Sequence, residues 1–191
     1  MLAKILVFSG STREGSLNLK LANALTMALS EKGAETTHLN LADYPLPVFN
    51  GDLEMPENAE ALSALFCEAD GLVISSPEYN SSLSPLLKNT IDWVSTTKTK
   101  SDQGFGPYVG KICFIAACSP GALGGIRGLY HLRSVLMNVG AEIITSQLAV
   151  GNGGAAFDEE GRLVDERHKS MMETGLASFL RTIEAMKSDD E

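Results

Sequence analysis

Residues 3–18 read Ala-Lys-Ile-Leu-Val-Phe-Ser-Gly-Ser-Thr-Arg-Glu-Gly-Ser-Leu-Asn, an apolar run followed by a polar loop. The run at 3–8 is short and rich in branched residues, as in a buried strand. Apolar residues recur with helical spacing from Leu17 onward, so a helix should follow the loop. A loop between a strand and a helix N-terminus exposes backbone N–H groups beside the positive end of the helix dipole. The stretch therefore predicts a βα unit with an anion site.

The side chains of this loop indicate which anion it suits. Ser11, Ser16 and Asn18 offer neutral donors, and Arg13 offers a forked cation that matches phosphate. No G-x-x-x-x-G-K-[ST] or G-x-G-x-x-G spacing is present, which argues against a nucleotide-triphosphate or dinucleotide loop. The pattern favours a terminal monophosphate. The alternative is an ordinary βα turn in which Ser16 only caps the helix.

Composition limits the function further. The 191 residues, 1–191, fit one domain, and the net charge of −9 argues against nucleic acid and anionic membranes as partners. No apolar run reaches the ~20 residues of a membrane span, and Met1–Phe8 is too short for a signal peptide, so we expect a cytoplasmic protein. Cys67, Cys113 and Cys118 lack metal-ligand spacing and are expected to be small buried hydrophobes; no metal site is predicted.

Strand-like and helix-like patterns alternate along the whole chain. Strands are expected at 3–8, 35–41, 71–76, 111–117 and 142–149, and helices at 17–32, 57–68, 84–96, 125–139 and 165–187. This alternation predicts an α/β fold, a three-layer sandwich around a five-stranded parallel sheet. Ligands of such sheets bind outside the carboxyl ends of the strands, which directs attention to the loops after the first, third and fourth strands.

Two of those loops have the composition of a ring-binding site. Residues 76–83 read Ser-Pro-Glu-Tyr-Asn-Ser-Ser-Leu, which could hydrogen-bond the edge of a heterocycle while Tyr79 flanks it; Ser84 and Pro85 should start the next helix. Residues 118–125 read Cys-Ser-Pro-Gly-Ala-Leu-Gly-Gly, and glycines let a backbone approach a planar ligand. Either loop alone could be a simple turn, but all three together favour a phosphorylated ring compound.

These motifs resemble the NADPH-dependent FMN reductase family, in particular its chromate and quinone reductase branch. The resemblance rests on Gly10-Ser11-x-Arg13-x-x-Ser16-x-Asn18, on Pro77-Glu78-Tyr79-Asn80 followed by Leu87-Lys88-Asn89-x-Ile91-Asp92-Trp93, on Ser119-x-Gly121-x-x-Gly124-Gly125, and on Tyr130-His131-Leu132-Arg133. It runs over nearly the full length. One departure is Ser84-Pro85, where the family usually has Pro-Gly, so the turn beside the ring is expected to differ in shape.

The resemblance implies a flavodoxin-like fold with strand order 2-1-3-4-5 and FMN at the switch point. The phosphate would be held by Ser11, Arg13, Ser16, Leu17 and Asn18. The isoalloxazine ring would be lined on one side by Pro77, Glu78, Tyr79 and Asn80, largely through main-chain groups, and on the other by Ser119, Gly121, Gly124 and Gly125.

The implied activity is ping-pong hydride transfer from NADPH or NADH to FMN and on to a small-molecule electron acceptor: a quinone, azo compound, chromate or free flavin. FMN carries the redox step, so no catalytic side chain is required. A homodimer or homotetramer is implied, with Trp93 in a subunit contact and not in the core. The alternative function is a flavodoxin-type electron carrier without NAD(P)H oxidation of its own.

Overall fold

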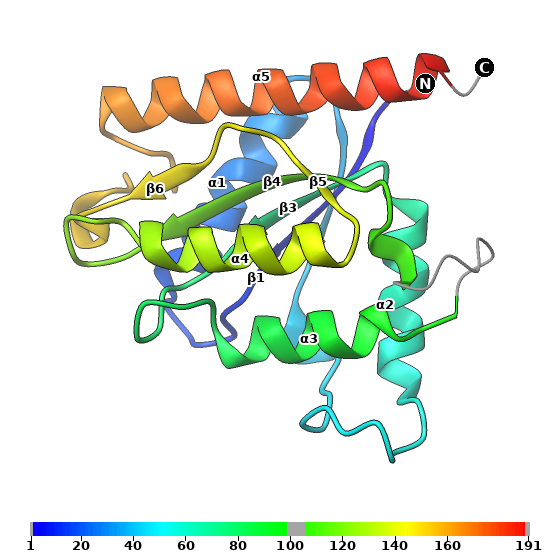
Figure 1. The fold of residues 1–191 in the computed structure, drawn as a ribbon. Helices are drawn as coiled ribbons and strands as arrows, with labels where there is room; N and C mark the ends of the chain where they lie inside the picture. The colour runs from blue at the N-terminus through cyan, green and yellow to red at the C-terminus, as the bar shows by residue number, and fades with distance from the viewer. Residues whose placement is uncertain (1, 99–105, 190–191) are drawn as a thin grey trace.

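The computed structural model describes residues 2–98 and 106–189, and Figure 1 shows one sheet flanked by helices. All strand pairs are parallel, in the order β2-β1-β3-β4-β5, with β6 also paired to β4. The strands are β1 (Lys4–Ser9), β2 (Glu35–Leu39), β3 (Gly71–Ser75), β4 (Ile112–Cys118), β5 (Glu142–Ile143) and β6 (Leu148–Val150). The helices are α1 (Leu17–Glu31), α2 (Glu57–Glu68), α3 (Pro85–Ser95), α4 (Ile126–Asn138) and α5 (Glu166–Asp189). The predicted α/β class and strand order are confirmed.

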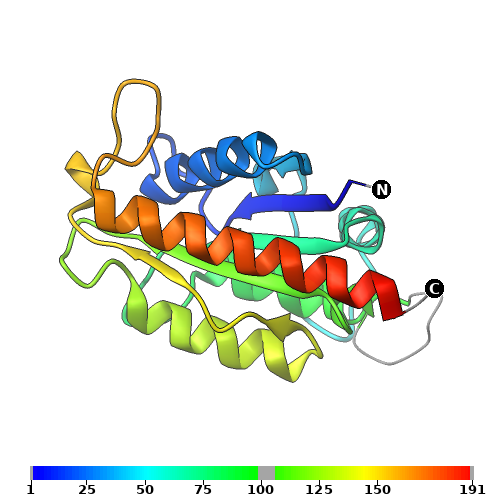
Figure 2. The same cartoon turned by 90° about the horizontal axis from the view of Figure 1, so that it is seen from above.

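The central strands are buried on both faces, which explains why they read as continuous apolar runs. Ile5 and Val7 of β1 pack in one core with α1 and α5. Leu6 and Phe8 point to the opposite face and pack in a second core with α2, α3 and α4. Figure 2 shows α1 and α5 along one side of the sheet and α4 along the other. The result is the expected three-layer sandwich.

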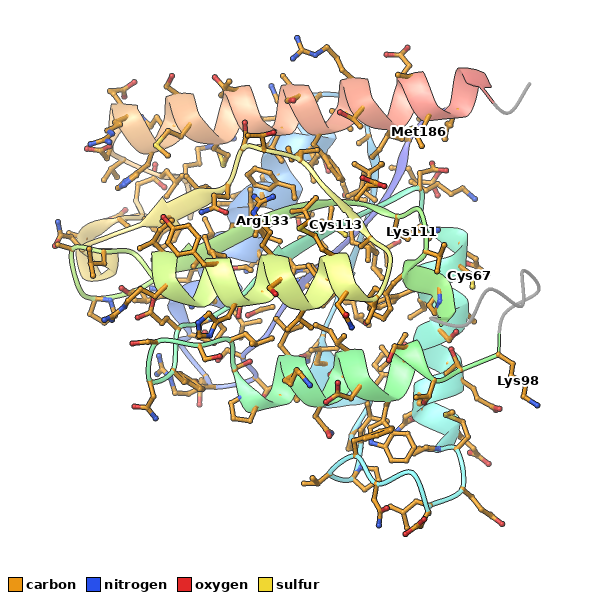
Figure 3. The ribbon with its side chains drawn as sticks, viewed as in Figure 1. Cys67, Lys98, Lys111, Cys113, Arg133 and Met186 are labelled. Atoms are coloured by element: carbon orange, nitrogen blue, oxygen red, sulfur yellow. The ribbon has the colours of Figure 1, made fainter. Side chains whose placement is uncertain are left out.

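The expected strand at 142–149 is wrong in one respect, because it is broken into β5 and β6. The Arg133 side chain extends from α4 (Figure 3) and donates to the carbonyls of Ile143, Ile144 and Thr145 over 3.1–3.4 Å and to Gln147 Oε1 over 3.0 Å. The guanidinium thus takes the place of a neighbouring strand for these carbonyls. Burial lowers the pKa of Arg133. The sequence of residues 142–149 alone does not reveal this contact, because its partner Arg133 lies in another element, α4.

Local signals in the sequence were mostly reliable. Ser16 and Ser84 cap α1 and α3 as predicted, with Pro85 in the first turn of α3. Two expectations are corrected: Cys67 is exposed, and Trp93 is 2% exposed within the chain itself, with its Nε1 donating to Pro47 O over 2.8 Å. Among the described residues, no helix has both the length and the apolar character needed to cross a bilayer.

Candidate functional site

Three loops follow β1, β3 and β4 at the carboxyl edge of the sheet, and the strand order reverses between β1 and β3. Gly10 N–H donates to Ser75 O over 2.8 Å, which joins the first loop to the end of β3. Ser84 Oγ donates to Gly10 O over 2.6 Å and so joins the first loop to the N-terminus of α3. A Cβ at Gly10 would lie 2.9 Å from Ser84 Oγ, so only glycine fits this junction. The first loop is therefore in direct contact with the residues on both sides of the second loop.

The first loop, residues 10–16, leaves backbone donors open. Ser11 and Ser16 are buried and their hydroxyls accept N–H bonds from within the loop and α1. Among the described residues, the N–H groups of Thr12, Gly15 and Leu17 have no protein partner. Gly15 has φ +67° and open space around it. Unpaired N–H groups at a helix N-terminus are a ready-made anion site.

Arg13 is exposed at the rim of this loop, and its Nη1 donates to Glu14 O over 3.1 Å. The remaining donors of its guanidinium are free to reach a ligand in front of α1. This placement is compatible with the predicted role of Arg13 as a phosphate ligand, which stays a prediction.

The side chain of Asn18 already makes hydrogen bonds within the protein. Its Nδ2 donates to Cys118 O and its Oδ1 accepts from Cys118 N–H, both over 2.9 Å, while Ser75 Oγ donates to the same Oδ1 over 3.1 Å. All three bonds are buried. We name this arrangement the Asn18 clasp; it ties α1 to the ends of β3 and β4. The geometry favours a positioning role for Asn18 over the predicted role as a phosphate donor.

The second loop turns sharply at Asn80 and Ser81. Tyr79 and Ser82 exchange two main-chain hydrogen bonds of 2.9 and 3.0 Å, and φ is +49° at Asn80 and +67° at Ser81. Two consecutive left-handed residues make a tight hairpin, and Ser81 adopts a conformation that favours glycine. The Tyr79 side chain is 47% exposed at the hairpin. The hairpin thus presents an exposed aromatic ring at its turn.

Glu78 faces α4 instead of the open edge. Its Oε2 accepts the N–H groups of Arg127 and Gly128 over 3.0 and 3.1 Å, and its Oε1 accepts Arg127 Nε over 2.8 Å. Although burial disfavours the carboxylate, these bonds from Gly128 and Arg127 lower the pKa of Glu78. The carboxylate therefore neutralises the N-terminus of α4, which lies at this edge with those of α1 and α3.

Most glycines of the third loop serve packing. Gly124 and Gly125 have φ of +63° and +87°, and a Cβ on Gly124 would lie 2.7 Å from Ala149 C. Gly121 is different: a Cβ at this position would have Ser119 Oγ, 3.9 Å away, as its nearest neighbour, so its face is open. Three glycines of this loop were predicted to let the backbone approach a ring. The structure has open space beside Gly121, whereas other atoms of the protein fill the space beside Gly124 and Gly125.

Three residues of the site were missed in the sequence. Gly153 packs closely against Cys118, because a Cβ on residue 153 would lie 2.8 Å from Cys118 Sγ. The N–H of Gly153 donates to Ser119 O over 2.9 Å. Gly128 lies against Glu78, with the position of a Cβ 3.3 Å from Glu78 Cα. Arg127 completes the contact with Glu78. The pattern Gly125-x-Arg127-Gly128 was visible, but nothing in it named Glu78 as the partner.

Away from the three loops, the described residues include a further cavity but no metal-binding cluster. Within them, no group of three or more His, Cys, Asp or Glu side chains could hold a metal ion. A cavity of about 1090 Å³ lies at the opposite edge of the sheet, lined by one face of α2, by residues 96–98 after α3, and by residues 106–111 before β4. None of the three loops contributes a residue to its lining.

Comparison with known proteins agrees with this picture. The chain is 32% identical over 181 residues to an NAD(P)H-dependent FMN reductase of Pseudomonas aeruginosa, covering 92% of each chain. It is 30% identical over 190 residues to a quinone reductase of Escherichia coli, covering 96% of this chain and 97% of the relative. The structure of FerB, a flavoenzyme NAD(P)H:(acceptor) oxidoreductase from Paracoccus denitrificans, superposes with a TM-score of 0.83 at 28% identity, covering 96% of this chain and 98% of FerB. The profile of the NADPH-dependent FMN reductase family matches residues 3–155, and the chain belongs to that family.

Proposed function

We propose that this protein is an FMN-dependent NAD(P)H oxidoreductase that reduces quinones or related acceptors, and that residues 1–191 form a single FMN-binding domain. The proposal combines the family of the chain with one observation, the open N-terminus of α1, which Asn18 ties to the ends of β3 and β4. There the N–H groups of Gly15 and Leu17 have no partner among the described residues, and Arg13 lies at the rim. This donor set suits a phosphate monoester.

The chemistry of the donors fits FMN at both of its ends. For the phosphate, Ser11, Ser16 and Leu17 would contribute from the loop and α1, and Arg13 would add charge. For the ring, the main chain of the 77–80 segment and the open face of Gly121 would flank the flat isoalloxazine. The helix α4 is not a rival phosphate site, because Glu78 already occupies its first turn. Asn18 would act indirectly, through its clasp.

FMN, when bound, supplies the hydride chemistry, and the chain's residues bind and orient the reactants. That chemistry would carry two electrons and one proton from the reduced nicotinamide to a quinone, whose second proton would come from solvent. The residues around the open ring face would admit the two reactants in turn. Because alignment is the main requirement, a rigid edge matters more than an acid or base residue. The Tyr79 ring and the hairpin behind it would border the opening.

The finer parts of the proposal are the acceptors and the assembly. Quinones come first because relatives are quinone reductases; azo compounds, chromate and free flavin would suit the same open face. A homodimer or homotetramer is proposed, since α4 carries two exposed apolar side chains seven residues apart, Tyr130 and Met137, at 59% and 60% exposure. A cytoplasmic location is proposed with it. Size-exclusion chromatography with light scattering tests the assembly, and a monomer would contradict it.

The decisive experiment for function compares wild type with Arg13→Ala and Arg13→Lys. Purified protein is titrated with FMN, and NADH or NADPH oxidation is followed with a benzoquinone. Loss of a charge-assisted hydrogen bond of about 1.5–3 kcal/mol should weaken FMN binding roughly 10- to 150-fold in Arg13→Ala. Arg13→Lys should recover part of it, because a single ammonium replaces the fork. Unchanged affinity in Arg13→Ala would reject the phosphate assignment.

The flavodoxin-type carrier makes a different prediction in the same assay. A carrier would bind FMN but would not oxidise NADPH or NADH with any quinone, ferricyanide or free flavin. The acidic charge of the chain suits a carrier that docks on basic partners. The family and the single exposed Tyr79 at the ring loops favour the enzyme, since one ring face would stay open to substrates.

A further inference from the structure

Glu78 and Arg127 make the densest polar contact at the carboxyl edge. The carboxylate receives two main-chain N–H bonds from α4, a bond from Arg127 Nε, and an ion pair with Arg127 Nη2 at 2.5 Å. The Glu78 side chain is 8% exposed and that of Arg127 55%. A carboxylate held by four donors has lost nearly all freedom, and the backbone on both sides of it is fixed as well.

The backbone that this contact fixes belongs to the proposed ring loop. Pro77 and Tyr79 are the immediate neighbours of Glu78, and Gly128 packs so closely that a Cβ there would lie 3.3 Å from Glu78 Cα and 3.1 Å from Ser82 O. The small residue at 128 lets the loop lie directly on the first turn of α4. Any change in how α4 holds Glu78 must therefore shift the main-chain groups that face the ring.

We propose that Glu78 and Arg127 are a positioning pair which fixes the 77–82 loop on α4 and, as a charge-neutral unit, sets the reduction potential of the flavin held there. The proposal rests on the proposed function, since it requires FMN at this edge. Neither side chain needs to touch the ring. The carboxylate adds negative potential beside the ring, and the guanidinium cancels it over a few ångströms.

Simple electrostatics gives the sign. Reduced FMN is more negative than oxidised FMN at neutral pH, so an uncompensated Glu78 should weaken binding of the reduced form most. An uncompensated Arg127 should do the reverse. Because Arg127 is half exposed, solvent screens the charge, and a roughly three- to tenfold change in the ratio of the two dissociation constants is expected. For a two-electron couple this is about 14–30 mV.

The test uses Arg127→Met, Arg127→Lys and Glu78→Gln, with Lys32→Met as the matched control. Lys32 pairs with Glu173 at the C-terminal end of α1, so its removal changes the net charge equally but at the remote end of that helix. Each protein is titrated with oxidised FMN, and its midpoint potential is measured by equilibration with redox dyes. Arg127→Met should lower the potential, Glu78→Gln should raise it, and the double variant should lie near wild type. Arg127→Lys should stay near wild type, because it keeps the charge.

The outcomes distinguish failure of the proposed Glu78–Arg127 pair from failure of the proposed FMN binding. Opposite shifts in the two single variants, larger than that of Lys32→Met, support the pair. Shifts in the same direction, or none beyond the control, overturn it while leaving FMN binding intact. Failure of wild type to bind FMN would overturn the proposed function, and this proposal with it. Should Glu78→Gln not fold, Arg127→Met against Arg127→Lys still decides, because both retain the main-chain donors to Glu78.

Discussion

Replacing Asn18 by alanine should destabilise the protein even without cofactor. The change removes three buried hydrogen bonds and leaves the N–H and C=O of Cys118 and the hydroxyl of Ser75 without their partner. At about 1 kcal/mol net for each bond, with extra cost for stranded buried main-chain groups, the free energy of unfolding should fall by about 3–4 kcal/mol. That is a large part of the stability of a typical domain.

Urea unfolding of the apoprotein measures this loss, with Trp93 as the probe, since it is the chain's single tryptophan and is buried. At an m-value of about 2 kcal/mol/M the midpoint should drop by about 1.5–2 M. Asn58→Ala is the matched control, because Asn58 makes one exposed bond, from Nδ2 to Pro45 O; it should cost less than about 1 kcal/mol. If Asn18→Ala left apoprotein stability intact yet weakened FMN binding tenfold, Asn18 would be a phosphate donor and the clasp argument would be refuted.

Three further predictions concern the loops. Gly124→Ala should lower the free energy of unfolding by about 3 kcal/mol or more, because its Cβ would meet main-chain atoms at 2.7–2.8 Å. Gly15→Ala, with a similar φ but open space around it, should cost only about 1 kcal/mol. Urea unfolding midpoints compare the two variants, and equal losses would contradict the packing argument. Ser81→Gly should stabilise the protein by about 0.5–1 kcal/mol by relieving φ +67°, and a lower melting temperature would contradict this. Because the pKa of Glu78 is lowered from 4.5 in the folded state, its contribution to stability is present above about pH 4.5 and is lost as the pH falls through the lowered value. The difference in unfolding free energy between wild type and Glu78→Gln should therefore become smaller on acidification. A difference that stays constant with pH would contradict the assignment.

The sequence was sufficient for the architecture because each signal was local. Apolar runs predicted β1, β3 and β4, serines at 16 and 84 predicted two helix starts, and the carboxyl-edge rule located the three loops. What failed depended on contacts between distant residues. The strand at 142–149 breaks because Arg133 of α4 takes over the carbonyls of 143–145. The role of Asn18 as a phosphate donor stays a prediction; its contact with Cys118, 100 residues away, could not be read from the sequence.

The same dependence on distant contacts explains why the sequence alone does not divide polar residues at strand ends into ligand-binding and structural ones. A donor that binds a ligand and a donor that binds the scaffold have identical chemistry, and only the partners already present tell them apart. At this edge the main-chain donors of the first turn of α4 are all paired: Arg127 and Gly128 with Glu78, and Ile126 and Leu129 with main-chain carbonyls. Within residues 2–98 and 106–189, the first turn of α1 retains the open N–H of Leu17 beside Gly15. A protein with a net charge of −9 can therefore still attract a phosphate, because the field at a helix N-terminus without an acidic partner acts at short range, while distant carboxylates are screened by salt.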